Sequence, residues 1–248
     1  MGSRAEGQWK EAGYIVISER KFSNSYSSFW NQLLPTADSF VRRLNLTCER
    51  FTKPIDSSLS VDRDKRAVIN ELAFRLFKEQ ANSGKISSGK IISLEQDVRS
   101  YIERLAPSIK KLTALSKEEL IESEKIAASL SAYFYKPDFK AMTFWPLLKG
   151  CGQLDACRAD IIYKNKLIEV KAGDRHFRIT DLRQIITYLA LNFYSQQYQL
   201  AYIALVNPRT GKEFECAIDT LIESCSGKKS VDVFSDVIDF LSAEVGSK

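Results

Sequence analysis

The sequence predicts an α/β fold in which a mixed sheet is flanked by helices. Two observations carry this prediction: residues 159–172 have the pattern of a tight hairpin, and residues 179–194 have the pattern of an amphipathic helix. From Ser116 onward the order is helix, strands, hairpin, helix and strand, which suits a sheet with helices on its faces. We therefore expect a mainly helical subdomain at 1–112 and an α/β core at 113–248.

Composition limits the class of protein. The chain has 248 residues and is 44% apolar, enough for a packed core. No apolar run approaches the ~18–20 residues of a membrane span, and the N-terminus lacks the apolar core of a signal sequence. We therefore expect no membrane association, no export and a cytoplasmic location. The net charge of +5 permits a nucleic-acid partner without indicating one.

The cysteines argue against a disulfide framework. There are five, an odd number, scattered along the chain, which suits a reducing compartment. Cys151 and Cys157 have no Cys-x-x-Cys partner pair, so neither a zinc site nor an iron–sulfur site is expected.

The first part of the chain has mainly helical patterns. A short strand at 14–17 is followed by helical patterns at 27–51 and 61–82. A further helix is expected to begin at the capping-box sequence 93–96 and to end before Pro107. This part is open to three uses: positioning a substrate, forming an interface with a partner protein or a second copy, or only packing over the core.

A lysine-containing loop, 83–90, is bracketed by Gly84 and Gly89. A glycine-rich loop with a lysine can hold phosphate groups, but this one lacks the Gly-Lys-Ser/Thr ending and a preceding strand. We therefore favour a flexible connector between two helices.

The α/β core begins with a helix from Ser116 to about Phe134, because Ser116 to Glu119 has the form of a capping box. Its apolar line consists of Leu120, Ala127, Ser131 and Phe134. Glu124 falls on the same line, and a carboxylate on an inward face needs a partner. Glu124 is thus either part of a site or paired with a basic neighbour at the rim, with Glu122 as the second choice for the site.

After an irregular strand pair at 143–158, the hairpin is expected to turn at Lys164-Asn165, because Asn tolerates positive φ. The β-branched and aromatic residues around the turn favour strands. A two-residue turn sets the register, which pairs Tyr163 with Lys166, Ile162 with Leu167, Ile161 with Ile168 and Asp160 with Glu169.

This register gathers charge on one face of the hairpin. Opposed residues have Cβ atoms roughly 4.5–5.5 Å apart, so Asp160 and Glu169 would lie together. Lys171, two residues beyond Glu169, shares their face, while Ile168 and Val170 point into the core. Opposed like charges destabilise a sheet. Lys171 offsets part of the repulsion, and a divalent cation between the carboxylates would offset more.

The helix at 179–194 is expected to start at Thr180 as its cap and to bury an apolar stripe. Gln184 and Tyr188 lie one turn apart at the edge of that stripe, either as a functional pair or as a plain polar edge. Strands at 200–206 and 213–218 and an amphipathic helix at 231–245 close the chain; these ranges come from the same patterns.

Asp160, followed by Glu169-Val170-Lys171, resembles the Asp…(Asp/Glu)-x-Lys core of the PD-(D/E)xK nuclease superfamily. Gln184 to Tyr188 is similar to the Gln-x-x-x-Tyr motif of its RecB and λ-exonuclease-like branch. The resemblance covers about residues 116–207. It implies a restriction-endonuclease-like fold, with a mixed central sheet flanked by helices.

The resemblance also implies an activity, the metal-dependent hydrolysis of phosphodiester bonds, chiefly in DNA. Mg²⁺ or Mn²⁺ would be held by Asp160, Glu169 and the Val170 carbonyl, with Glu124 as the acid from the first core helix. Lys171 would orient the attacking water. We expect little sequence specificity, because no element that would read bases is visible.

In the same reading, Gln184 and Tyr188 would hold the substrate strand or a water molecule. The loop after the hairpin adds Arg175, His176 and Arg178 as candidates for nucleic-acid contacts. Arginine suits phosphate oxygens through bidentate contacts. His176 is the only histidine, and it could be a base, a ligand, a phosphate contact or a surface residue.

Two alternatives remain. A nuclease-like fold could be catalytically silent and bind DNA or a partner protein, although the complete set of Asp160, Glu169 and Lys171 argues against this. An unrelated α/β domain could carry Glu169 and Lys171 as a surface ion pair.

Overall fold

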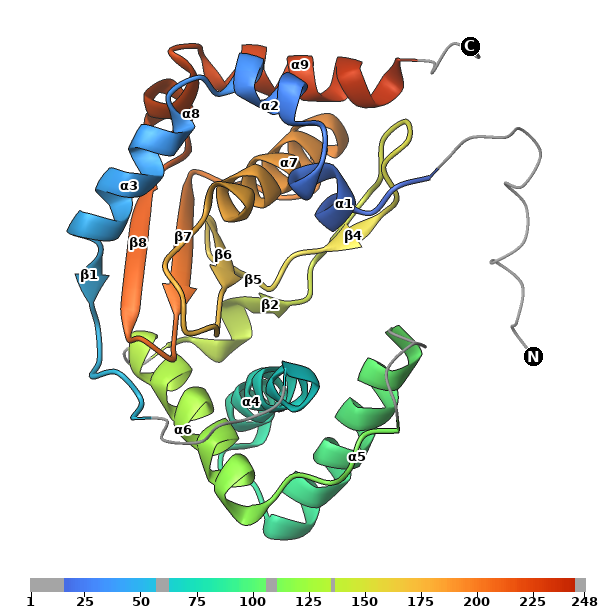
Figure 1. The fold of residues 1–248 in the computed structure, drawn as a ribbon, viewed down its shortest axis with the longest axis vertical. Helices are drawn as coiled ribbons and strands as arrows, with labels where there is room; N and C mark the ends of the chain where they lie inside the picture. The colour runs from blue at the N-terminus through green and yellow to red at the C-terminus, as the bar shows by residue number, and fades with distance from the viewer. Residues whose placement is uncertain (1–15, 57–62, 106–110, 135–136, 244–248) are drawn as a thin grey trace.

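The computed structural model describes residues 16–56, 63–105, 111–134 and 137–243 (Figure 1). The α-helices in these ranges are α1 (Glu19–Asn24), α2 (Ser27–Leu33), α3 (Ala37–Thr47), α4 (Arg63–Ser83), α5 (Ser88–Leu105), α6 (Lys117–Tyr133), α7 (Ile179–Ser195), α8 (Ile218–Ser226) and α9 (Ser230–Ser242), and a short 3-10 helix, η1, spans Phe139–Ala141. The strands are β1 (Glu49–Arg50), β2 (Met142–Phe144), β3 (Leu147–Leu148), β4 (Cys157–Arg158), β5 (Ile161–Tyr163), β6 (Lys166–Val170), β7 (Tyr202–Asn207) and β8 (Lys212–Ala217).

A mixed sheet forms the centre of the molecule. Its described strands run in the order β1-β8-β7-β6-β5-β2, and β3 and β4 form a separate pair. β6 and β7 are parallel and are joined through α7, whereas the other neighbours in the sheet are antiparallel. The predicted α/β class with a mixed sheet flanked by helices is therefore confirmed.

Each face of the sheet packs against its own set of helices (Figure 1). Leu167, Ile203 and Leu205 belong to the core that includes α7, α8 and α9. Ile168 and Ala204 belong to the core that includes α4 and α6. The alternation of strand side chains between two faces is what allows two helical layers to share one sheet.

Helices from the first part of the chain contribute to both cores. Trp30 of α2 is fully buried in the α7 core, where its Nε1 donates to the Phe22 carbonyl oxygen at 3.0 Å. Leu72 of α4 is fully buried in the other core. The predicted division at residues 112 and 113 stays a prediction; the packing shows that both halves of the chain bury side chains in the same two cores.

Two local expectations need correction, and one helix was missed. α5 begins at Ser88 rather than at Ser93, since the Ser87 hydroxyl accepts the Lys90 N–H at 3.3 Å and caps the helix earlier. α7 has Arg178 rather than Thr180 at its cap position. Helix α8, between β8 and α9, was not predicted.

Other predictions lie partly outside the described residues. The strand expected at 14–17 overlaps them only at Val16 and Ile17, and Ile17 forms a bridge with Leu154. Pro107, expected just after a helix end, lies outside them.

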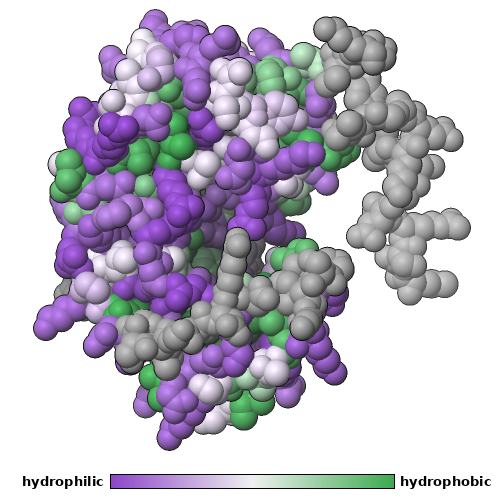
Figure 2. Space-filling view, in the orientation of Figure 1, coloured by the Kyte–Doolittle hydropathy of each residue, from purple (hydrophilic) through white to green (hydrophobic). Residues whose placement is uncertain are grey.

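The visible face of the molecule is mainly hydrophilic, with hydrophobic residues in small scattered groups (Figure 2). Among the described helices, none has the length and apolar character to span a bilayer. Among the described residues, the buried apolar side chains gather in the two cores.

Candidate functional site

The hairpin of β5 and β6 has the predicted register. Tyr163 pairs with Lys166, Ile162 with Leu167 and Ile161 with Ile168. The positive φ at the turn falls on Lys164, at 57°, and not on Asn165 as predicted. The turn is therefore strained at a lysine, and the pairing of the two strands holds it in place.

Asp160 leaves the ladder instead of pairing with Glu169, because β5 begins one residue later. Its carboxylate accepts the backbone N–H of Val170 at 2.7 Å. Its carbonyl oxygen accepts the N–H of Trp145 at 2.9 Å. The side chain thus turns toward the end of β6 and contacts the backbone of Val170, the residue after Glu169, instead of facing Glu169 in a ladder pair.

Glu169 lies on β6 and is only 3% exposed. Its Oε1 accepts Lys171 Nζ at 2.7 Å. Its Oε2 is buried and, among the residues that the structure describes, has no hydrogen-bond partner. An unsatisfied buried carboxylate oxygen is costly, so this atom is suited to a ligand that supplies positive charge.

Lys171 is the centre of a hydrogen-bonded chain. Its Nζ donates to Glu169 Oε1 and, at 2.6 Å, to Gln184 Oε1. Gln184 Nε2 donates to the Tyr188 hydroxyl at 2.8 Å, and that hydroxyl donates to the Arg158 carbonyl oxygen at 3.3 Å. The predicted pair on α7 therefore lies against the predicted lysine, and it connects the ammonium group to the backbone just before Asp160.

The electrostatics of the site agree with this geometry. Burial, followed by the charge of Glu169, raises the pKa of Asp160 well above its usual range, although Lys171 opposes the shift. Burial alone would lower the pKa of Lys171, but the charges of Glu169 and Asp160 outweigh it and raise that pKa. The ammonium group of Lys171 therefore stays protonated, and Asp160 holds a proton more tightly than a free aspartate, because burial and the charge of Glu169 disfavour its ionised form.

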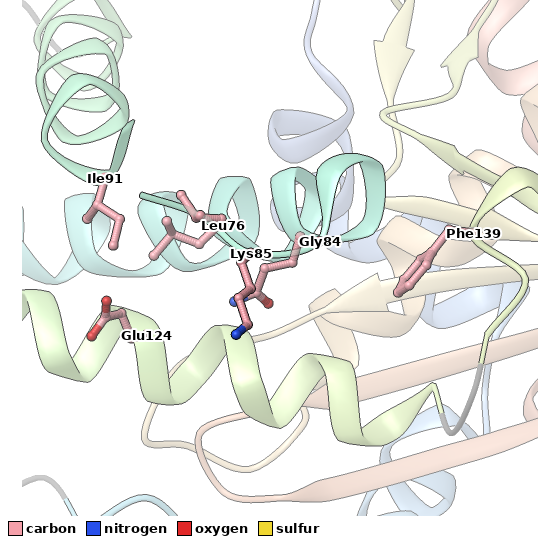
Figure 3. A pocket seen from close by; sticks show the side chains of 8 residues that line it. Leu76, Gly84, Lys85, Ile91, Glu124 and Phe139 are labelled. Carbon is pink, nitrogen blue, oxygen red and sulfur yellow. The ribbon is translucent and has the colours of Figure 1, made fainter. Parts of the chain in front are cut away.

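Glu124, predicted to be the acid from the first core helix, is on the wrong face of α6. It is exposed and lines a cavity of about 450 Å³ with Leu76, Lys85 and Ile91 (Figure 3). The buried face of α6 instead carries Glu119, Glu122, Ser123, Ile126, Ala127, Ser129 and Leu130. The predicted apolar line was displaced from the true stripe, because polar residues with partners occupy part of the buried face.

Glu71 of α4 is an acid near the site that the sequence patterns missed. Its charge contributes to the raised pKa of Asp160. Its Oε1 accepts Arg75 Nε at 2.8 Å, which leaves the carboxylate partly neutralised. No local signal marks Glu71, because it reaches Asp160 only through the packing of α4 beneath the sheet.

The basic loop after β6 is arranged differently from the prediction. Arg175 donates to both carboxylate oxygens of Asp181, at 2.6 and 2.8 Å, so its guanidinium is largely committed within the protein. His176 and Arg178 are exposed. Of the three predicted nucleic-acid contacts, these two have side chains open to a ligand.

Asp181 is a further residue that was missed. It is 3% exposed, and its Oδ2 accepts the N–H of Arg178 at 2.8 Å. Burial alone would raise the pKa of Asp181, but the hydrogen bonds from Arg175 and the charge of Lys171 lower it. Its position in the first turn of α7 was the available signal, since an acid there caps the helix.

Arg209 is a buried residue that holds the start of the loop after β6. Its side chain is 2% exposed, pairs with Glu122, and donates from Nε to the Ala172 carbonyl oxygen at 2.8 Å. Its Nη2 donates to Asn70 Oδ1 at 2.9 Å. Arg209 thus ties α4, α6 and the turn after β7 to the residue that follows Lys171. A buried arginine of this kind has no sequence signature.

Asp160 and Glu169 suit a hard divalent cation that takes only a few of its ligands from the protein. Within the described ranges, no group of three or more His, Cys, Asp or Glu side chains is arranged to hold an ion. Mg²⁺ is often bound by only one or two carboxylates and otherwise by water and substrate phosphate. Asp160 and the unsatisfied oxygen of Glu169 match that requirement.

Neither a scan against models of protein families nor a search of curated proteins finds a match for this chain. The features of this chain that bear on its function are therefore the positions and contacts of Asp160, Glu169, Lys171, Gln184 and Tyr188.

Proposed function

We propose that this protein is a metal-dependent nuclease of the PD-(D/E)xK type, with a restriction-endonuclease-like core, that hydrolyses phosphodiester bonds in DNA. One observation carries the proposal: Glu169 has a buried oxygen without a hydrogen-bond partner among the described residues, next to Lys171 and close to Asp160. Two clustered acids destabilise an apo protein, and a cation would relieve them.

Asp160, Glu169 and the Val170 carbonyl would hold Mg²⁺ or Mn²⁺. When bound, such an ion supplies charge stabilisation at phosphoryl oxygens and makes water a better nucleophile at neutral pH.

Lys171 has the central role among the protein's own groups. With its pKa raised, it remains a cation that donates hydrogen bonds. Facing Glu169, it can orient an attacking water and stabilise charge that develops on the phosphate. Gln184 and Tyr188 hold the ammonium group in position through their own hydrogen bonds. His176 and Arg178, both exposed, would bind neighbouring phosphates.

The direct test is cleavage of end-labelled DNA by the purified protein in Mg²⁺, in Mn²⁺ and in EDTA. We expect cleavage only with the metals. Gln184→Ala should lower the rate about tenfold, because it removes the acceptor 2.6 Å from Lys171 Nζ. Gln199→Ala, at an exposed position, is the matched control and should cleave at the wild-type rate.

A contaminating nuclease would be equally active in both glutamine variants, and that result would contradict the proposal. DNA binding without any cleavage in either metal would favour the catalytically silent alternative.

A second prediction concerns the acid on α4. Glu71→Gln is expected to lower the apparent affinity for Mn²⁺ in the cleavage assay about tenfold, because the charge of Glu71 acts on Asp160. Glu124→Gln makes the same change at the exposed position on α6 and should leave the metal dependence unchanged. The measurement is the cleavage rate across a Mn²⁺ titration. If Glu124→Gln weakened the Mn²⁺ dependence and Glu71→Gln did not, Glu124 would be the acid that a helix contributes to the metal site.

A further inference from the structure

Trp145 is fixed beside the candidate site through its backbone. Its N–H donates to the Asp160 carbonyl oxygen at 2.9 Å, and Arg158 Nη1 donates to the Trp145 carbonyl oxygen at 2.8 Å. Its φ of 49° lies in the left-handed region, which disfavours a bulky side chain. The surroundings therefore hold Trp145 in this conformation, with its backbone hydrogen-bonded to that of Asp160.

Trp145 is partly exposed, and residues of α4 contact its indole ring. The ring of Phe74 lies 5.4 Å from it between centroids. Lys78 Nζ lies 4.2 Å from the ring centroid, in a cation–π contact. An ammonium group and an aromatic surface are thus combined at one place.

The face of α4 that carries Lys78 also contributes a second cation–aromatic pair, formed by Arg75 and Tyr101. Glu71, Arg75 and Lys78 are spaced by four and three residues, so they lie along one face. The Arg75 guanidinium lies 5.1 Å from the ring centroid of Tyr101 on α5. The helix rises roughly 10 Å from Glu71 to Lys78, which is only a few nucleotides' length. Both cation–aromatic pairs therefore lie near Glu71, whose charge acts on the Asp160 carboxylate.

Aromatic rings next to cations suit a strand with unpaired bases. Bases stack on the rings whatever their sequence, and the cations bind the backbone phosphates. In a duplex, the flat faces of the bases are covered by their neighbours, so this chemistry is available only to a single strand or to an opened end.

We propose that Trp145 and Tyr101, together with Lys78 and Arg75, bind the unpaired strand of a single-stranded or end-opened DNA substrate beside the two carboxylates. Lys78 would exchange its contact with the indole for a phosphate while a base stacks on the ring. The inference rests on the proposed nuclease function, because it names the substrate class of the same site.

The test measures binding in EDTA, so that cleavage does not take part. A labelled single-stranded 12-mer and the blunt duplex of the same sequence are titrated with the full chain, and anisotropy is recorded. We expect wild type to bind the single strand at least about tenfold more tightly. Trp145→Leu should weaken that binding roughly 5- to 150-fold, the range for losing one stacked base, while Trp145→Phe should retain most of it.

Tyr194→Leu is the matched control, since Tyr194 is 57% exposed on α7 and outside this surface. Circular dichroism checks that each variant is folded. If Trp145→Leu does not fold, Lys78→Gln and Tyr101→Leu carry the test, each with an expected loss of single-strand affinity of about threefold or more.

Equal binding of the single strand and the duplex, or a folded Trp145→Leu protein with wild-type affinity, would overturn the inference. Loss of single-strand binding in the aromatic variants supports it even if no cleavage is found, a result that would overturn only the nuclease proposal. Cleavage that persists unchanged in Trp145→Leu would overturn this inference alone.

Discussion

Replacing Lys171 with alanine is expected to lower the rate of metal-dependent DNA cleavage by roughly 10²- to 10³-fold, the usual loss when one group that stabilises transition-state charge is removed. Lys171 Nζ lies 2.7 Å from Glu169 Oε1 and 2.6 Å from Gln184 Oε1, and its side chain is 16% exposed. A water molecule that filled the space left by the substitution would be neutral and could not replace the positive charge of the ammonium group. The measurement is the single-turnover rate with end-labelled DNA in Mn²⁺.

Lys166→Ala is the matched control, because Lys166 lies on the same strand but pairs with Glu215 away from the site. It should cleave within about twofold of wild type. If Lys171→Ala retained the wild-type rate while remaining folded, the ammonium group would have no part in the chemistry and the proposed mechanism would fail.

Replacing Asp160 with asparagine is expected to stabilise the metal-free protein at neutral pH. Burial and the charge of Glu169 raise the pKa of Asp160 in the folded state. The folded protein therefore holds this proton more tightly than the unfolded chain, whose Asp pKa is about 3.9. The resulting contribution to the free energy of unfolding is present at lower pH and is lost as pH rises through the raised pKa.

Asparagine does not ionise, so it removes this pH dependence. Its amide oxygen can still accept the Val170 N–H, which in wild type lies 2.7 Å from the Asp160 carboxylate. At pH 7 in EDTA we expect a gain of about 1 kcal/mol, which corresponds to ~2–4 °C in Tm for a chain of this size. The gain should shrink toward pH 4. The measurement is a set of thermal melts between these pH values.

In Mg²⁺, wild type should be more stable than Asp160→Asn, the reverse of the order expected in EDTA. Binding to the folded state alone stabilises wild type by about 2.7 kcal/mol at a hundred times the dissociation constant. Asp160→Asn should gain little, because one of the two acids is gone. A wild-type Tm that does not respond to Mg²⁺ or Mn²⁺ would argue that the acids serve another purpose.

Much of the candidate site was predictable because it is local in the chain. A two-residue turn sets the register of β5 and β6, and the helix that follows places Gln184 and Tyr188 one turn apart. Lys171 and Gln184 are separated by only thirteen positions, and they meet at 2.6 Å. Periodicities of two and 3.6 residues suffice to bring such neighbours together.

The phase of α6 was predicted wrongly for a physical reason. Glu119 and Glu122 occupy its buried face because Lys65 and Arg209 pair with them. From a single sequence, an acid that will find a buried partner looks the same as one that will face solvent, so Glu124 was placed inward by mistake.

The sequence by itself thus determined the α/β class, the hairpin and the motif residues on β6 and α7, since each depends on neighbours along the chain. Only the tertiary structure decided that Glu71 acts on Asp160, that Asp181 holds Arg175, and that Trp145 faces Lys78. Contacts between distant segments depend on how helices pack on the two faces of the sheet. That packing is settled by the burial and pairing of the whole chain, and no local pattern carries it.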